Sequence, residues 1–268
     1  KEELAETNAG LERLVEERTV KLREMVAELE HFSYSLVHDM RAPLRAIQSF
    51  GGMVVEESMQ ALTPDAQDYL SRIMTASNRM DQLITDALNY SKVVRASLPL
   101  RPVDLAALLQ GMIESYPAFA PGRAEIRLEG QFPLVLGNEA GLTQCFSNLL
   151  GNAVKFVRPG QMPRVKVWAE RIRKAALDGP GSETRDRQTT DMVRIWVEDN
   201  GIGIPPDCAH KIFGMFQRMH GPEYEGTGIG LALVRKVVER MGGSVGVESK
   251  QGEGSRFWVE LQAAAEEA

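Results

Sequence analysis

The fold of the C-terminal part is decided by the stretch Val193-Arg-Ile-Trp-Val-Glu-Asp199-Asn-Gly201-Ile-Gly203-Ile204. Apolar and polar residues alternate up to the residue before Asp199, which predicts a β-strand with one face in a core. The two glycines that follow permit a tight turn and a close approach of the backbone to a ligand. The Asp199 carboxylate can accept a hydrogen bond from an exocyclic amine. Taken alone, Asp-Asn-Gly is also a common turn.

The segments around this stretch predict a domain of mixed helices and strands. The patterns predict strands near 126–129, 133–136, 165–169, 244–248 and 255–261, and helices near 104–116, 140–156 and 229–241. Residues 173–191 are charged and rich in Gly, Ser and Thr, which predicts an extended, mobile hairpin tip. One sheet layered on a few helices is an α/β sandwich, and we expect that architecture here.

Three polar residues fall on one face of the helix predicted at 140–156. Asn148 and Asn152 are four residues apart, and Lys155 follows three residues later. The amide oxygen of Asn152 suits Mg²⁺, and Lys155 can bind a phosphate. An ordinary polar helix face with a hydrogen-bonded asparagine is the alternative.

A glycine-rich segment opens the last predicted helix. It consists of Gly226, Thr227, Gly228, Ile229, Gly230 and Leu231. Exposed N–H groups at a helix start favour a phosphate, although a plain glycine-rich turn is the alternative. The roughly twenty residues before it, 205–225, have the length of a lid beside a nucleotide site, with Phe213 and Phe216 holding the lid in one position. Simple packing of these two phenylalanines is equally compatible with the sequence.

The N-terminal third predicts a helical hairpin. Apolar residues recur at heptad spacing through residues 1–36, at Leu11, Val15, Leu22, Met25, Leu29, Phe32 and Leu36. This pattern predicts a parallel coiled-coil dimer, with an amphipathic helix packed on its own domain as the alternative. The first helix is expected to reach about Met59, and Thr63-Pro64-Asp65 begins a second helix that runs to about Ala96. One hairpin cannot bury both apolar stripes, so two hairpins should pair as a four-helix bundle. Residues 98–102 contain two prolines, which stop the second helix and predict a hinge.

His38 lies beside the heptad positions, so we expect its ring to face solvent. Its ordinary pKa near 6.5 leaves the ring mostly neutral at pH 7, and a neutral imidazole is a competent nucleophile toward phosphorus. Asp39 can take or hold the ring proton as charge develops. An isolated His–Asp pair would more commonly be an ordinary surface pair.

Composition excludes some functions. The net charge of −6 disfavours a nucleic-acid surface, and two cysteines are too few for a disulfide framework. No apolar run approaches the roughly 20 residues needed to span a bilayer. Because the chain begins at Lys1 rather than Met, we interpret it as a cytoplasmic fragment whose sensor domain lies upstream, in a protein that could be membrane-attached.

Five of these segments, in this order, resemble the histidine kinases of two-component signalling. The resemblance covers residues from about 30 to 262 and includes the segments 38–44, 148–156, 199–204, 213–216 and 226–231. The ATP-binding part also resembles gyrase-type, mismatch-repair and chaperone ATPases. An ATPase without phosphohistidine and a non-catalytic dimeric scaffold remain the alternative functions.

The resemblance implies a coiled-coil segment at 1–30, a dimerisation and phospho-acceptor domain at 31–97, and an ATP-binding catalytic domain at 98–268. It implies that the chain is a homodimer that uses ATP and Mg²⁺ to phosphorylate His38, with assistance from Asp39. The phosphoryl group would then pass to an aspartate in the receiver domain of a response regulator. Relatives commonly carry Thr or Asn four residues after the histidine, where it positions water for partner dephosphorylation; Ala42 cannot do so, and the resemblance does not extend to that activity.

The resemblance also assigns roles within the ATP site. Asn152 would bind Mg²⁺ and Asp199 would recognise adenine, while Lys155 and the amides of 226–230 would hold phosphates. The full set of ATP-binding residues that it implies is Asn148, Asn152, Lys155, Asp199, Gly201, Gly203, Phe216, Gly226, Thr227, Gly228, Ile229, Gly230 and Leu231.

Overall fold

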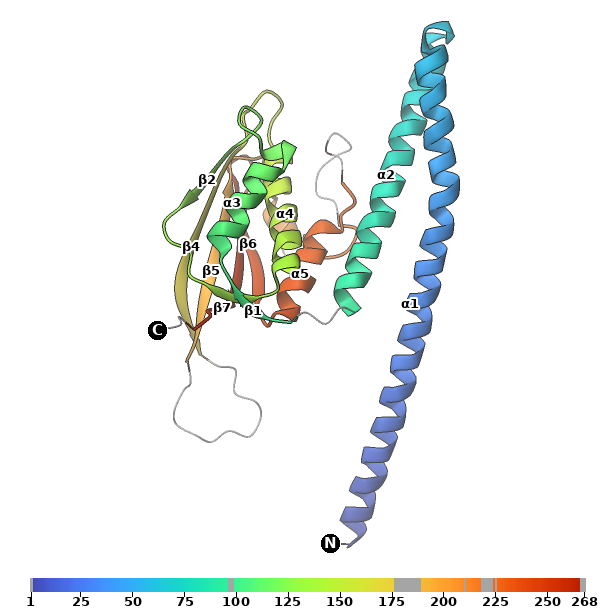
Figure 1. Cartoon of the computed structure of the whole chain (residues 1–268). Coiled ribbons are helices and arrows are strands. Elements are labelled where there is room, and N and C mark those ends of the chain that lie inside the picture. Colours follow the sequence, from blue (N-terminus) through green and yellow to red (C-terminus); the bar gives the residue numbers. More distant parts are fainter. Residues whose placement is uncertain are drawn as a thin grey trace. The chain divides into compact units, whose positions relative to one another are not determined.

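The computed structural model describes residues 2–95, 99–175, 189–209, 211–217, 224 and 226–265. The chain divides into two compact units, Lys1–Ser91 and Lys92–Ala268 (Figure 1). The predicted end of the second helix at Ala96 and most of the predicted hairpin tip at 173–191 lie outside the described residues.

The first unit is a helical hairpin, as predicted. Helix α1 spans Glu2–Ser58, and a short 3-10 turn, η1 (Met59–Ala61), leads to helix α2, Pro64–Arg95. The predicted start of α2 is confirmed, because the Thr63 hydroxyl accepts a hydrogen bond from the Ala66 N–H (3.3 Å). Helix α1 continues through Pro43 without a break in the helical backbone.

Contacts between α1 and α2 fix the hairpin register. Leu44 on α1 and Ile84 on α2 are buried. Arg41 donates to the Thr85 hydroxyl (2.9 Å). About two helical turns further along α1, Gln48 donates to Asn78 (3.0 Å). Apolar burial and these cross-helix hydrogen bonds together hold the two helices antiparallel.

The second unit is an α/β sandwich, which confirms the predicted layer architecture. Its five-stranded sheet has the order β2 (Glu125–Glu129), β4 (Arg164–Ala175), β5 (Thr189–Asp199), β7 (Gly254–Gln262) and β6 (Ser244–Lys250). Strands β2 and β4 are parallel, and the other neighbours are antiparallel. Helices α3 (Leu105–Ser115), α4 (Glu139–Lys155) and α5 (Gly230–Arg240) lie on one face of the sheet, as Figure 1 shows.

The sequence did not predict the small second sheet of this unit. Strand β1 (Arg101–Val103) pairs antiparallel with β3 (Val135–Gly137), where the prolines at 99 and 102 suggested only a hinge. Proline is tolerated here because each strand of a two-stranded sheet has a neighbouring strand on one side only. An N–H on the other side is not needed for pairing. The 3-10 turns η2 (Pro117–Phe119) and η3 (Pro206–Cys208) complete the described elements of the unit.

The core lies between the sheet and the helices. On β5 the inward residues Val193, Ile195 and Val197 are fully buried, and Phe146 and Leu150 of α4 are buried as well. Alternate residues of a strand point to opposite faces, so this spacing of two aligns one apolar face with the helices.

The opposite face of the sheet carries all three tryptophans of the chain. Trp168, Trp196 and Trp258 occupy one cross-strand row on β4, β5 and β7. The rings of Trp168 and Trp196 stack at 5.9 Å between centroids. The Arg194 guanidinium lies 5.5 Å from the Trp196 ring and 5.1 Å from the Trp258 ring. The row therefore shields from water a strip of the sheet face opposite α3, α4 and α5.

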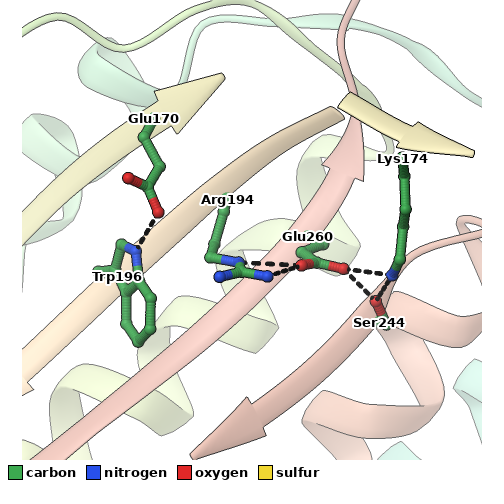
Figure 2. A network of polar contacts seen from close by, with 6 residues as sticks. All are labelled: Glu170, Lys174, Arg194, Trp196, Ser244 and Glu260. Atoms are coloured by element: carbon green, nitrogen blue, oxygen red, sulfur yellow. Dashed lines mark hydrogen bonds and ion pairs between the residues drawn. The ribbon is translucent and has the colours of Figure 1, made fainter. Parts of the chain in front are cut away.

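Beside this row lies a buried carboxylate, Glu260, whose side chain is 1% exposed. Figure 2 shows its four-residue network: Arg194 donates at 2.9 Å, Lys174 at 2.7 Å and the Ser244 hydroxyl at 2.6 Å. In the same view Trp196 donates its indole N–H to Glu170 (2.8 Å). Burial alone would raise the pKa of the Glu260 carboxyl, but the hydrogen bonds from Lys174, Ser244 and Arg194 hold that pKa below its usual value.

Replacing Glu260 with Gln should lower the free energy of unfolding of the second unit by about 2 kcal/mol at pH 7, because Arg194 and Lys174 lose their charged acceptor. The folded-state pKa lies below the ordinary 4.5, so the carboxylate stabilises the fold above that pH, and the contribution is lost as pH falls below it. Urea unfolding at several pH values checks this. An equal difference between variant and wild type at pH 7 and pH 3 would contradict it.

Candidate functional site

Asp199 ends β5 and is largely buried. Its Oδ1 accepts hydrogen bonds from the Gly201 N–H (2.8 Å) and the Ser255 N–H (3.2 Å). In the described part of the chain, no donor is bonded to its Oδ2, which leaves that oxygen as an acceptor. Burial raises the pKa of Asp199 to about 6, and the charge of Glu198 acts in the same direction, while the two backbone hydrogen bonds oppose them. Asp199 is therefore an ionised acceptor at neutral pH, although its raised pKa lies close to that pH.

The glycines after Asp199 are required by the packing of the protein itself. A Cβ on Gly201 would lie 2.3 Å from the Phe156 carbonyl oxygen. Gly203 has φ +69°, and a Cβ there would lie 2.1 Å from the Lys250 carbonyl oxygen. The tight turn predicted from the sequence is confirmed, and the backbone that approaches these glycines belongs to the neighbouring segments.

Helix α4 presents its predicted polar face to the glycine-rich segment. A Cβ on Gly230 would lie 2.5 Å from Asn148 Oδ1, and one on Gly226 would lie 3.5 Å from Lys155 Nζ. Asn148 also donates to the Gln144 carbonyl one turn earlier (2.8 Å). Asn152 lies between these two positions on α4 and is half-buried. Two motifs about 75 residues apart in sequence are thus brought against each other.

The glycine-rich segment meets the predicted lid as well. Gly228 has φ +75°, and a Cβ there would lie 2.8 Å from backbone atoms of Phe216 and Gln217. Ile229 is buried and precedes α5, which begins at Gly230, one residue later than predicted. The Ile229 N–H donates to the Thr227 hydroxyl (3.4 Å), while Leu231 lies in the first turn of α5 and is half-buried.

The two phenylalanines of the predicted lid behave differently. Phe213 packs edge-on against Phe257 of β7, with 6.5 Å between ring centroids. Phe216 is 61% exposed and adopts φ 60°, a left-handed conformation that costs of order 1 kcal/mol in a non-glycine residue. In this structure Phe213 is packed and Phe216 is not, so the two do not clamp the lid together.

Sequence reasoning missed two groups at this site. The Tyr224 ring packs at a tilt of 39° against Phe156 (5.5 Å between centroids), and its hydroxyl donates to the Val157 carbonyl (3.3 Å). Lys155 Nζ lies 5.4 Å from the same Phe156 ring. Ser255 supplies the second N–H to Asp199. The Gly-Glu-Gly turn before Ser255, between two predicted strands, was the available signal for the second group; nothing in the sequence marked Tyr224.

His38 and Asp39 lie on the continuous helix α1, five and four residues before Pro43, respectively. Their side chains are outside the described part of the structure, so the predicted exposure of the ring stays a prediction.

The fold and the site define a class of ATPase. Residues 137–265 match the family of histidine kinase-, DNA gyrase B- and HSP90-like ATPases, and residues 28–94 match the His Kinase A phospho-acceptor domain. The chain therefore combines a phospho-acceptor domain with such an ATPase domain, the arrangement of the histidine kinases of two-component signalling. It belongs to the sensor histidine kinase family.

Similar proteins agree with this assignment. The chain is 32% identical over 237 residues to the phytochrome-like protein Cph1 of Synechocystis, covering 88% of the chain and 29% of that protein. It is 32% identical over 272 residues to the sensor histidine kinase AruS of Pseudomonas aeruginosa, covering 95% and 25%. The crystal structure of full-length ShkA in complex with AMPPNP aligns with a TM-score of 0.59 at 29% identity, covering 87% of this chain and 46% of that one. The chain spans less than a third of the length of these two curated relatives. Among the described helices, none combines the length and the apolar character needed to cross a bilayer.

Proposed function

We propose that the second unit binds ATP with Mg²⁺ and that its γ-phosphoryl group is transferred to His38, and from there to an aspartate of a response regulator receiver domain. The observation that carries the ATP site is the contact of Asn148 and Lys155 on α4 with the segment Gly226–Gly230. This contact places a cation and the start of a helix together, where both favour phosphate. Asp199 lies at the end of β5 with Oδ2 as the acceptor for the adenine amine.

The residues present also fit Mg²⁺. Asn152 is half-buried on the same face of α4 as Asn148 and Lys155, and its amide oxygen is a hard ligand. Mg²⁺ takes few protein ligands and otherwise binds phosphates and water, so one amide oxygen beside a phosphate site suffices. When bound, the ion would neutralise charge on the phosphates. Lys155 and the N–H groups at the start of α5 would share that role.

The chemical step makes few demands on the protein. A neutral His38 nitrogen attacks the γ-phosphorus, an N–P bond forms, and the P–O bond to ADP breaks. Asp39 accepts the proton from the other ring nitrogen as positive charge develops on the imidazole. Attack requires the reacting atoms to approach to roughly 3–3.5 Å, so the catalytic work of the two units is positioning.

We further propose the division into a coiled-coil segment at 1–30, a phospho-acceptor domain at 31–97 and a catalytic domain at 98–268. The matched ranges 28–94 and 137–265 support the last two parts. Because α1 is continuous from Glu2 to Ser58, a displacement of its N-terminal part would be transmitted to His38 along one rigid element. The signal would come from a sensor domain upstream of the coiled coil, consistent with relatives more than three times as long.

The experiment that tests the proposal is incubation of the chain with γ-labelled ATP and Mg²⁺. Acid-labile, alkali-stable label on the protein supports histidine phosphorylation. Release of inorganic phosphate without any protein-bound label would favour an ATPase without phosphohistidine. Absence of nucleotide binding would favour a non-catalytic scaffold.

We propose a homodimer, because the hairpin exposes large apolar side chains that one hairpin does not cover. On α1 and α2 these include Ile47, Phe50, Met53, Tyr69, Ile73 and Met80, each more than 40% exposed. Burying such surface against a second hairpin would remove it from water, which is the usual driving force for a four-helix bundle.

Replacing Phe50 and Ile73 together with Asp should therefore convert a dimer into a monomer, because burying two carboxylates in an apolar bundle is unfavourable. Sedimentation equilibrium of the wild type and the variant measures this. Met162→Asp is the matched control, since Met162 is 43% exposed in the second unit, outside the hairpin. A monomeric wild type, or a Met162→Asp variant that dissociates equally, would contradict the prediction.

Nucleotide affinity should depend on pH through Asp199. Protonation removes the charge of the acceptor and puts a proton on an oxygen that must accept from the adenine amine. Because burial raises the pKa of Asp199 to about 6, affinity for ADP should be constant above pH 7 and fall as the pH decreases through 6. Calorimetric titration between pH 5 and pH 8 checks this. An affinity that stays flat down to pH 5 would show that Asp199 does not bind the base as an ionised group.

A further inference from the structure

The loop 199–204, which we call the adenine loop, is held from two sides. The Ile202 N–H donates to the Phe156 carbonyl (2.9 Å), and the Ile202 carbonyl accepts from the Gly252 N–H (2.8 Å). Arg158 then donates to the Gly252 carbonyl (3.2 Å). These three hydrogen bonds form a closed ring from the end of α4, through the adenine loop, to the turn between β6 and β7, and back. The turn between β6 and β7 is therefore part of the support of the adenine loop.

Close packing at two glycines reinforces this ring. A Cβ on Gly203 would lie 2.1 Å from the Lys250 carbonyl oxygen, and one on Gly254 would lie 2.1 Å from the Asp199 carbonyl oxygen. The loop and the turn leave no space between them for a side chain at either position. A shift of the turn would consequently move the adenine loop with it.

One side chain, Ser249 at the end of β6, joins the two ends of the adenine loop. Its Oγ accepts from the Ile204 N–H (2.8 Å) and donates to the Gly254 carbonyl (2.9 Å), and it lies 2.9 Å from Ser255 Oγ. A hydroxyl has one proton and two lone pairs, so Ser255 must be the donor in the last of these contacts. All three hydrogen-bonding positions of the Ser249 hydroxyl are then used.

The Gly254 carbonyl and the Ser255 N–H belong to the same peptide group. Ser249 binds its oxygen, and Asp199 Oδ1 binds its N–H (3.2 Å). A continuous chain of hydrogen bonds thus runs from the Ile204 N–H through the Ser249 hydroxyl and this peptide to the Asp199 carboxylate. Hydrogen bonds in such a chain polarise and strengthen one another.

We infer that Ser249 is a positioning residue for nucleotide recognition: its hydroxyl, without touching the nucleotide, orients the Gly254–Ser255 peptide that holds the carboxylate of Asp199. This inference rests on the proposed function of Asp199 as the adenine acceptor. The group that contacts the base would be Asp199 on β5. The group that sets the geometry of this carboxylate would be Ser249 on a different strand, β6.

Loss of the hydroxyl has two consequences. It leaves the Ile204 N–H without its acceptor, and it releases the Gly254–Ser255 peptide. The Ser255 N–H bond is one of the two that lower the pKa of Asp199, so weakening it should move that pKa upward. The charge that acts on Asp199 is that of Glu198 on β5, which is ion-paired with Arg256 of β7 at 2.5 Å, and the substitution leaves this pair in place.

The test compares three variants of the full chain by calorimetric titration with Mg²⁺ and ADP from pH 5 to pH 8. Ser249→Ala should weaken binding about tenfold at pH 7, and the pH at which affinity falls to half should move upward. Ser249→Thr retains the hydroxyl and should restore both values. Ser244→Ala is the matched control, because it removes a bonded serine hydroxyl at the other end of the same strand, far along β6 from the adenine loop.

The pH midpoint distinguishes positioning from general destabilisation. If Ser249→Ala and Ser244→Ala have the same affinity and the same midpoint, the inference is wrong. It is equally wrong if Ser249→Ala binds more weakly with an unchanged midpoint, since the effect then does not pass through Asp199. Thermal unfolding of each variant checks that the affinities compared are those of folded proteins. A wild type that does not bind Mg²⁺ and ADP at all would instead remove the proposed nucleotide site itself.

Discussion

Replacing His38 with Gln is expected to abolish phosphorylation of the chain while leaving nucleotide affinity unchanged. Glutamine keeps a polar side chain of helical preference on α1 but has no nucleophilic ring nitrogen, so no N–P bond can form. The proposed nucleotide contacts all lie in the second unit, more than 100 residues further along the chain. Label from γ-labelled ATP should therefore fall to background, with the Kd for ADP equal to that of the wild type.

His31→Gln is the matched control for this variant. His31 lies on the same helix α1 and, seven residues earlier, on the same helical face as His38. The His31 variant should retain full labelling. Label that persists in His38→Gln, or that disappears in His31→Gln alone, would move the phospho-acceptor away from His38.

Asp39→Asn refines the same result. An amide cannot accept the ring proton, so the rate of labelling should fall while the affinity for ADP stays near that of the wild type. Equal losses in labelling and in affinity would contradict a role for Asp39 in the chemical step.

The second large effect is expected from Asp199→Asn, which should weaken ADP binding roughly 100-fold. The substitution is nearly isosteric. The amide oxygen can keep the hydrogen bonds from the Gly201 and Ser255 N–H groups, which forces the amide nitrogen into the position of Oδ2. A donor then faces the donor amine of adenine, and the buried pair cannot both be satisfied.

This variant separates recognition from folding. Because the internal hydrogen bonds of Asp199 are retained, and burial of a neutral amide costs less than burial of a carboxylate, thermal stability should be unchanged or higher. Asp191→Asn is the control: it lies on the same strand β5, but its carboxylate is 60% exposed and pairs with Arg173 on the surface. Unchanged ADP affinity in Asp199→Asn would exclude Asp199 from adenine recognition.

Much of the secondary structure could be predicted from short stretches of sequence. The Thr63 cap of α2 and the alternation around Ile195 on β5 each depend on a few consecutive residues. The start of α2 and the end of β5 were predicted within one position, whereas β5 begins at Thr189, four residues before the predicted alternation. The α4 helix was predicted to within a residue at each end, because its polar face and its apolar face repeat with the helical period. Strand β1 was missed because Pro102 resembles a break, and only a partner strand shows that its missing N–H is not needed.

The features of the candidate site likewise divide into those that the sequence predicted and those that only the folded structure shows. Asn148, Lys155, Asp199 and the glycine-rich segment could be proposed as a set from residue type and spacing. That Phe213 packs on Phe257 while Phe216 is exposed depends on the neighbouring strand, and no local pattern distinguishes the two phenylalanines.

By itself, the sequence determined the hairpin, the sandwich and the residue types available for phosphoryl transfer, because each follows from patterns a few residues long. Only the tertiary structure decided that β2 pairs parallel with β4, that partial burial raises the pKa of Asp199 to about 6, and that Ser249 connects to Asp199 through one peptide group. These features join segments up to 56 residues apart. Their physical reason is that strand order and register set which backbone N–H groups meet a given carboxylate, and neither is encoded in the local pattern of any one segment.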